Sequence, residues 1–119
     1  MFDSQALAAL GVDAEAGLAY CAGDPEFYAE MLGEYAAEAR VGLDELERFF
    51  AGQDWQRYGI RAHSIKSTSR MIGATAFSEL ARALEFAARE GRTGDIAARH
   101  APFVAGYRQL AGGIREALG

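Results

Sequence analysis

The stretch GDPEFYAEMLGEYAAEARVGLDELERFFAGQ, residues 23–53, decides the fold because it describes one long amphipathic helix with a clear beginning. Asp24 is a favourable N-cap residue, and Pro25 suits the first helical position. Apolar residues then recur at helical spacing, at positions 28, 31, 32, 35, 39, 43, 46 and 50. The pattern predicts one helix over 24–51, bent near Gly42.

Two short helices are expected before this stretch. Residues 4–10 form an apolar segment with Ser4 as its N-cap, and residues 13–21 form another with Asp13 as its N-cap. Glycines follow both segments and end them. The N-terminal part of the chain is therefore predicted to carry one or two short extra helices.

Three further helices are expected after residue 53, over 54–72, over 75–90 and from about residue 95 onward. Each has one apolar face at helical spacing. The inward residues are Trp55, Tyr58, Ala62, Ile65, Ser69 and Ile72 in the first; Phe77, Leu80, Ala81, Leu84, Ala87 and Ala88 in the second; and Ile96, His100, Phe103, Tyr107, Leu110, Ile114 and Leu118 in the third. Pro102 should kink or split the last helix.

Four amphipathic helices joined by short loops predict an all-α, antiparallel up-and-down four-helix bundle. Half of the residues are hydrophobic, which is enough for a core at this length. No linker divides the chain, so residues 1–119 are expected to form a single domain. The length and the starting methionine favour a free-standing protein.

Composition excludes several classes of function. A net charge of −5 argues against binding to nucleic acid, whose phosphates require clustered basic residues. Cys21 is the only cysteine, so there is no internal disulfide, and with two distant histidines a zinc site is not expected. No apolar window approaches the roughly 18 residues of a membrane span, and no signal peptide is present. We therefore expect a cytoplasmic protein that does not bind membranes.

One face of the helix predicted over 54–72 concentrates chemistry. The segment RAHSIKSTSRMIGA, residues 61–74, contains the only lysine of the chain, three residues after a histidine. The side chains of Gly59, His63, Lys66 and Arg70 follow one another along this face, at spacings of four, three and four. The two cations favour the neutral, nucleophilic ring of the histidine and would stabilise an anion attached to it. Gly59 removes a side chain from the approach side. The face suits a phosphoryl group, although a surface histidine without chemistry has the same pattern.

The segment AHSIKSTSRMIGA resembles the signature of histidine-containing phosphotransfer domains, the four-helix carriers of two-component phosphorelays. The matching residues are Ala62, His63, Ile65, Lys66, Ile72, Gly73 and Ala74, with Leu84 and Glu85 following at the family's distance. The segments GDPEFYAEML and GQDW also resemble the family's openings of the two preceding helices. The similarity extends from about residue 11 to residue 117.

This resemblance implies roles for individual residues. His63 would be the phosphorylated residue and Lys66 the neighbour that neutralises the phosphate charge. The position after the lysine is often glycine in the family, whereas this chain has Ser67. The surface that docks a partner would include Gly59, Ser67 and Arg70.

The resemblance also implies the partners. They would be receiver domains of response regulators and a hybrid sensor histidine kinase, in signal transduction of the kind found in bacteria. The receiver would bring a phospho-aspartate and its Mg²⁺, so this chain needs no cofactor or metal of its own. We expect a monomeric phosphocarrier without ATP-dependent kinase activity.

Two alternatives belong to other classes of function. The first is a helical interaction domain of the same fold that is not phosphorylated. The second is a bundle-type phosphatase or a kinase dimerisation module, for which an acidic residue directly after the histidine would be the cue; Ser64 stands there. His100 lies on an apolar stripe and is expected to be a core histidine, not a second phosphorylation site.

Overall fold

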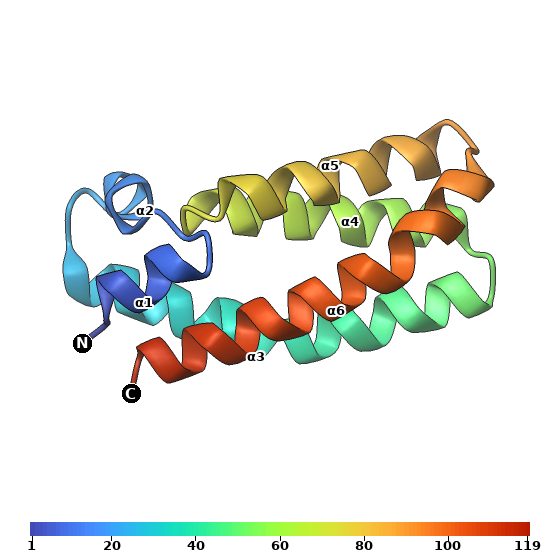
Figure 1. Cartoon of the computed structure of the whole chain (residues 1–119). Helices are drawn as coiled ribbons and strands as arrows, with labels where there is room; N and C mark the ends of the chain where they lie inside the picture. The colour runs from blue at the N-terminus through green and yellow to red at the C-terminus, as the bar shows by residue number, and fades with distance from the viewer.

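The computed structural model describes all 119 residues and contains six helices and no strand (Figure 1). They are α1 (Ser4–Ala9), α2 (Ala14–Tyr20), α3 (Pro25–Ala51), α4 (Trp55–Met71), α5 (Thr75–Arg89) and α6 (Thr93–Ala117). The predicted all-α class, the four long helices and the two short N-terminal helices are confirmed. No helix has the length and the hydropathy that crossing a membrane would require.

Aspartate side chains begin the first four helices. Asp13, Asp24 and Asp54 each accept backbone N–H groups of the first turn that have no partner inside the helix. The prediction that Ser4 caps α1 is wrong, because Asp3 is the residue in the extended conformation and accepts from the N–H groups of residues 5 and 6. Ser4 already has helical geometry and cannot serve as the N-cap.

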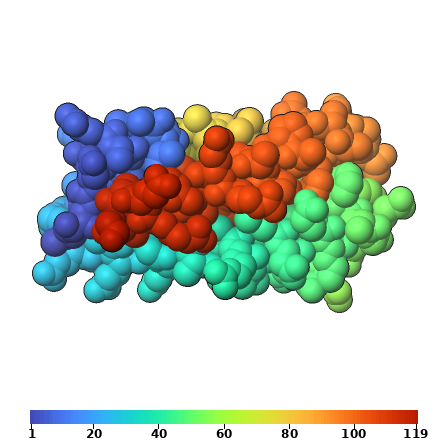
Figure 2. Space-filling view, turned by 60° about the horizontal axis from the view of Figure 1, so that its bottom comes forward, coloured from blue at the N-terminus to red at the C-terminus, as the bar shows by residue number.

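The four long helices form a closed ring of neighbours. Helix α3 packs against α4 and α6, and α5 packs against the same two helices, so α3 and α5 are diagonal. Helix α1 lies on α6, and the N–H of Asp3 donates to the carbonyl of Ala117 over 2.9 Å. Figure 2 shows this face, with the N-terminal segment beside the last turns of α6 and α3 along the other edge. Both termini are therefore at one end of the bundle.

The core contains tyrosines whose hydroxyl groups are all satisfied by other helices. Tyr28 donates to the carbonyl of Ile72 over 2.7 Å, and the Tyr35 and Ser69 hydroxyls lie 2.7 Å apart. Most predicted inward residues are buried, including Ala62, Ile65, Ala81, Leu84, Ile96 and Ile114. The polar bonds between helices fix how each helix is rotated, because a buried hydroxyl without a partner is costly.

Two predictions about the last helices need correction. Leu80 was expected inside but is 50% exposed, whereas Ser78 and Glu85 are buried. Both buried polar residues contact α4, and these contacts set the rotation of α5. Helix α6 begins at Thr93 and continues through Pro102 without splitting. A proline removes only one backbone hydrogen bond, and burial of Phe103 and Tyr107 keeps the following turns in place.

The expected bend at Gly42 gives way to another reason for this glycine. A Cβ atom at Gly42 would lie 3.2 Å from the ring of Tyr107, so the glycine allows α6 to approach α3 closely. Gly73 has a φ of +91°, which ends α4 in a conformation that favours glycine, and its carbonyl accepts the N–H of Asp13. This bond ties α2 to the junction between α4 and α5.

Candidate functional site

His63 stands on the outer side of α4, beside α5. Its side chain is 59% exposed, as the helical spacing predicted. The Nδ1 atom of the ring lies 2.7 Å from Oε2 of Glu85 on α5. The ring is therefore anchored at one nitrogen and open to solvent on the rest of its surface.

Glu85 is a buried carboxylate that joins three side chains. It is only 6% exposed. Its Oε1 atom lies 2.7 Å from Nζ of Lys66, and its Oε2 atom accepts from the guanidinium of Arg89 over 2.9 Å in addition to the contact with His63. Burial raises the pKa of this carboxyl, but the hydrogen bonds from Lys66 and His63 outweigh burial, so the pKa lies below its ordinary value. Glu85 is therefore ionised at neutral pH.

The ionised carboxylate determines which tautomer His63 adopts. A carboxylate only accepts hydrogen bonds, so Nδ1 of His63 must carry the proton and donate it. In the neutral ring the lone pair is then on Nε2, which forms no hydrogen bond within the protein. The site consequently presents an exposed nucleophilic nitrogen whose orientation is fixed from behind.

The predicted site residues are brought together only in part. Lys66 is close to His63 through their shared partner Glu85. Arg70 is exposed and forms no hydrogen bond or ion pair, so the expected second cation beside the histidine is Arg89 rather than Arg70. Ser67 is half-buried and makes no side-chain hydrogen bond. Nothing in these positions tests their predicted role in docking.

Gly59 has a different structural role from the one expected. A Cβ atom there would lie 3.2 Å from Cβ of Ala88, so the missing side chain lets α4 and α5 approach each other. The prediction that it clears the approach to His63 is corrected accordingly. The close approach nevertheless leaves a shallow hollow of about 350 Å³ beside the histidine, lined by Trp55, Gln56, Gly59, Ile60, His63, Glu85, Ala88 and Arg89.

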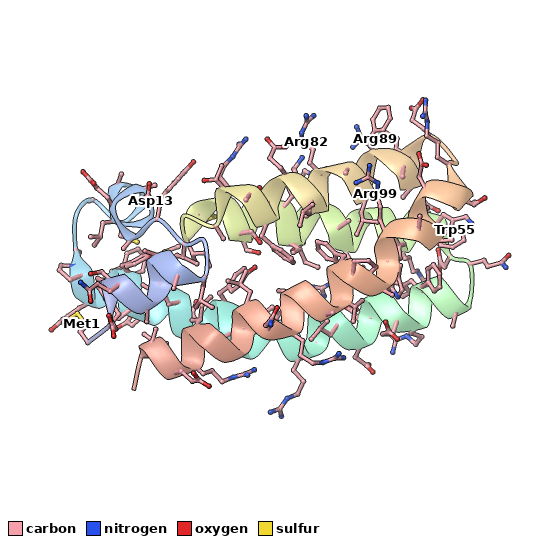
Figure 3. All side chains as sticks on the ribbon, in the orientation of Figure 1. Met1, Asp13, Trp55, Arg82, Arg89 and Arg99 are labelled. Atoms are coloured by element: carbon pink, nitrogen blue, oxygen red, sulfur yellow. The ribbon has the colours of Figure 1, made fainter.

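Arg89 and Glu85 are the site residues that the sequence reasoning missed. Glu85 was noticed at its spacing but received no role, and its contact with His63 depends on packing between two helices. Arg89 follows one turn later, which is a spacing that a helical ion pair uses. Its side chain is 70% exposed and projects from the side of α5 turned away from α3, as does that of Arg82 (Figure 3).

The second histidine has no free nitrogen. His100 is buried, its Nε2 donates to Glu47 over 2.9 Å, and its Nδ1 lies 2.8 Å from the hydroxyl of Tyr58. Its ring is stacked on Phe50 with centroids 3.9 Å apart. The expectation that His100 belongs to the core is confirmed.

Comparison with known proteins adds a family. The family model described as Hpt domain matches residues 30–117, a span that includes all of α4 and α5 and most of α3 and α6. His63, Lys66, Glu85 and Arg89 all lie within the matched residues. Neither a curated protein nor a solved structure matches the chain.

Proposed function

The chain belongs to the Hpt domain family, and from this premise we propose that it is a phosphorelay intermediate whose phosphoaccepting residue is His63. Hpt domains take part in histidine phosphotransfer, interact with response-regulator receiver domains and are phosphocarriers rather than kinases. In the proposal, a phosphorylated receiver domain donates its phosphoryl group to His63, and another receiver domain later removes it.

The pairing of His63 with Glu85 is the observation that carries the proposal. The lone pair of Nε2 attacks the phosphorus atom of the phospho-aspartate in line. The bond between phosphorus and the aspartate oxygen breaks, and its electron pair leaves on the receiver's carboxylate. The proton on Nδ1 stays where it is, 2.7 Å from Glu85. Such transfers depend mainly on positioning and on charge stabilisation.

Glu85 also stabilises the product of this step. Attack by the neutral ring leaves a positive charge on the phosphorylated imidazole, next to the ionised carboxylate. In the onward transfer the bond between Nε2 and phosphorus breaks, its electrons return to Nε2, and a neutral imidazole is released. Because the ring never has to leave as an anion, both directions of transfer are accessible.

Two cations are available for the phosphoryl oxygens. Lys66 and Arg89 are both held by Glu85, within one side chain of His63. When a phosphoryl group is attached to Nε2, each can turn part of its charge toward that group. No set of three or more His, Cys, Asp or Glu residues is arranged to hold a metal ion. The Mg²⁺ that we expect the receiver to carry would supply further charge neutralisation in the complex.

The receiver must cover the surface around His63 for this reaction. We propose that its footprint includes Gly59, Ser67 and Arg70, which lie on α4 on both sides of the histidine. We further propose that a hybrid sensor histidine kinase lies upstream and that the chain acts as a monomer in the cytoplasm.

Phosphotransfer from purified receiver domains tests the proposal. Receivers from the same organism are phosphorylated with radiolabelled acetyl phosphate and mixed with the wild type, with His63→Gln and with His100→Gln. We expect acid-labile, base-stable label on the wild type and on His100→Gln, and none on His63→Gln. Label that persists on His63→Gln would refute the assignment of the acceptor. A wild type that no receiver labels, while the same receivers label another carrier, would favour the interaction domain.

A further inference from the structure

The largest apolar hollow of the molecule lies between α3 and α4, outside the histidine site. Its volume is about 680 Å³, and seven of its ten lining residues are hydrophobic, so burying an apolar partner there is favourable. Tyr35 and Tyr107 form part of the lining, and Phe27 and Met71 are exposed at it. We call this hollow the α3–α4 groove. It is lined by Phe27, Met31, Glu34, Tyr35, Ala37, Glu38, Thr68, Met71, Ile72 and Tyr107.

An acidic row follows the α3 side of this groove. Glu30, Glu34 and Glu38 are spaced by four residues on α3, and the last two line the groove. Like charges at this spacing destabilise a helix. Glu38 is offset by Arg61, at 3.3 Å, but Glu30 and Glu34 form no ion pair. Cations are therefore lacking along this edge of the groove.

We propose that the α3–α4 groove selects the receiver partner, by taking an amphipathic helix of that receiver whose apolar face is flanked by Lys or Arg residues. The proposal rests on the phosphorelay function proposed above. A groove between two antiparallel helices runs along their axes, which suits a third helix. The apolar residues of that helix would contact Phe27 and Met71, and its cations would meet Glu30 and Glu34.

The groove lies within reach of a receiver that is docked on His63. Thr68 and Met71 follow His63 on α4 by five and eight residues, which is roughly 8–12 Å along the helix axis. A standard interface covers about 800 Å² on each partner, so one centred on His63 extends over the groove. A second copy of the chain is a poor occupant, because it brings the same acidic row and a net charge of −5.

Binding of the unphosphorylated receiver that labels His63 best provides the test, by titration calorimetry at low and high salt. Glu34→Lys is compared with Glu116→Lys, an exposed glutamate on α6 without an ion pair, so the net charge changes equally. Phe27→Ala is compared with Phe86→Ala, because the two rings are 49% and 51% exposed. All four positions are on the surface, so each variant should fold.

We expect Glu34→Lys and Phe27→Ala each to raise the dissociation constant about tenfold or more, a loss typical of truncating a central interface residue. The two controls should stay within about twofold, as exposed positions outside an interface do. Affinity of the wild type should fall with salt, and that of Glu34→Lys should fall less.

Equal constants for each variant and its control would overturn the groove, and label on His63 in the same preparations would leave the phosphorelay function standing. The expected pattern of constants without label would do the reverse. Concentration-dependent dimerisation that Phe27→Ala abolishes would assign the groove to a second copy and overturn the proposal.

Discussion

The two histidines occupy two regions of one bundle and differ in what meets the second ring nitrogen. Each gives one nitrogen to a carboxylate, Glu85 for His63 and Glu47 for His100. The other nitrogen of His63 faces solvent on a side chain that is 59% exposed, whereas that of His100 meets Tyr58 on a side chain that is 7% exposed. The same pair of residue types therefore positions a nucleophile in one region and fastens three helices in the other.

Removing Glu85 should disturb the reactive region most. We expect Glu85→Ala to lower the rate of labelling of His63 by about 100-fold, because fixing the tautomer of a reacting histidine is worth at least that much. Glu85→Gln keeps an acceptor for Nδ1–H and should lose less. Rapid-quench phosphotransfer measures both rates, with Glu79→Gln as the control on the same helix. Rates for Glu85→Ala equal to those of the control would show that the carboxylate does not position the ring.

Removing the buried histidine should affect stability instead of transfer. We expect His100→Gln to lower the free energy of unfolding by about 2 kcal/mol, since Glu47 and Tyr58 lose their partner and Phe50 loses its stacked ring. Exposed His63→Gln should change it by less than about 0.5 kcal/mol. Urea unfolding followed by circular dichroism gives both values. A larger loss for His63→Gln would reverse the comparison.

Lys66 and Arg70 separate contact from proximity in sequence. Lys66 reaches Glu85 beside the histidine, while Arg70 contacts no charged group. Lys66→Ala should slow labelling about tenfold, the loss of one charge-assisted hydrogen bond. Arg70→Ala should leave the rate with a fixed amount of bound receiver within about twofold, as expected for an exposed position. Single-turnover rates at saturating receiver distinguish the two, and equal losses would restore the importance of the sequence stripe.

Arg89 and Arg82 provide a matched pair on α5. Both are exposed, but Arg89 pairs with Glu85 whereas Arg82 pairs with Glu79 over 2.8 Å. Arg89→Ala should shorten the lifetime of phosphorylated His63 or slow its formation about threefold, as expected for a mobile exposed cation. Arg82→Ala should change neither. The lifetime of isolated labelled protein measures the first effect, and identical lifetimes and rates for the two variants would remove Arg89 from the site.

Most of the fold follows from local patterns, whereas half of the site does not. Apolar spacing predicts the buried faces that include Tyr58, Ala62 and Ile65, since burial of one face is a property of a single helix. The pair His63 and Glu85 is separated by 22 residues and forms only when α4 packs on α5. Leu80 was misplaced for the same reason, because partners on α4 determine the rotation of α5.

The smallest expected effect concerns pH and follows from the lowered pKa of Glu85. A carboxyl whose pKa is lower in the folded state than its ordinary value of 4.5 stabilises the fold above that value. This stabilisation declines as the pH falls through the folded pKa, when Glu85 is protonated and releases Lys66. Between about pH 5.5 and pH 3, the free energy of unfolding of the wild type should therefore fall more than that of Glu85→Gln. Urea unfolding across this range measures the difference, with Glu116→Gln as the control. Parallel curves for the wild type and Glu85→Gln would mean that the three hydrogen bonds to Glu85 do not favour its ionised form, and Nδ1 of His63 would lose the acceptor that distinguishes it from the histidine of the core.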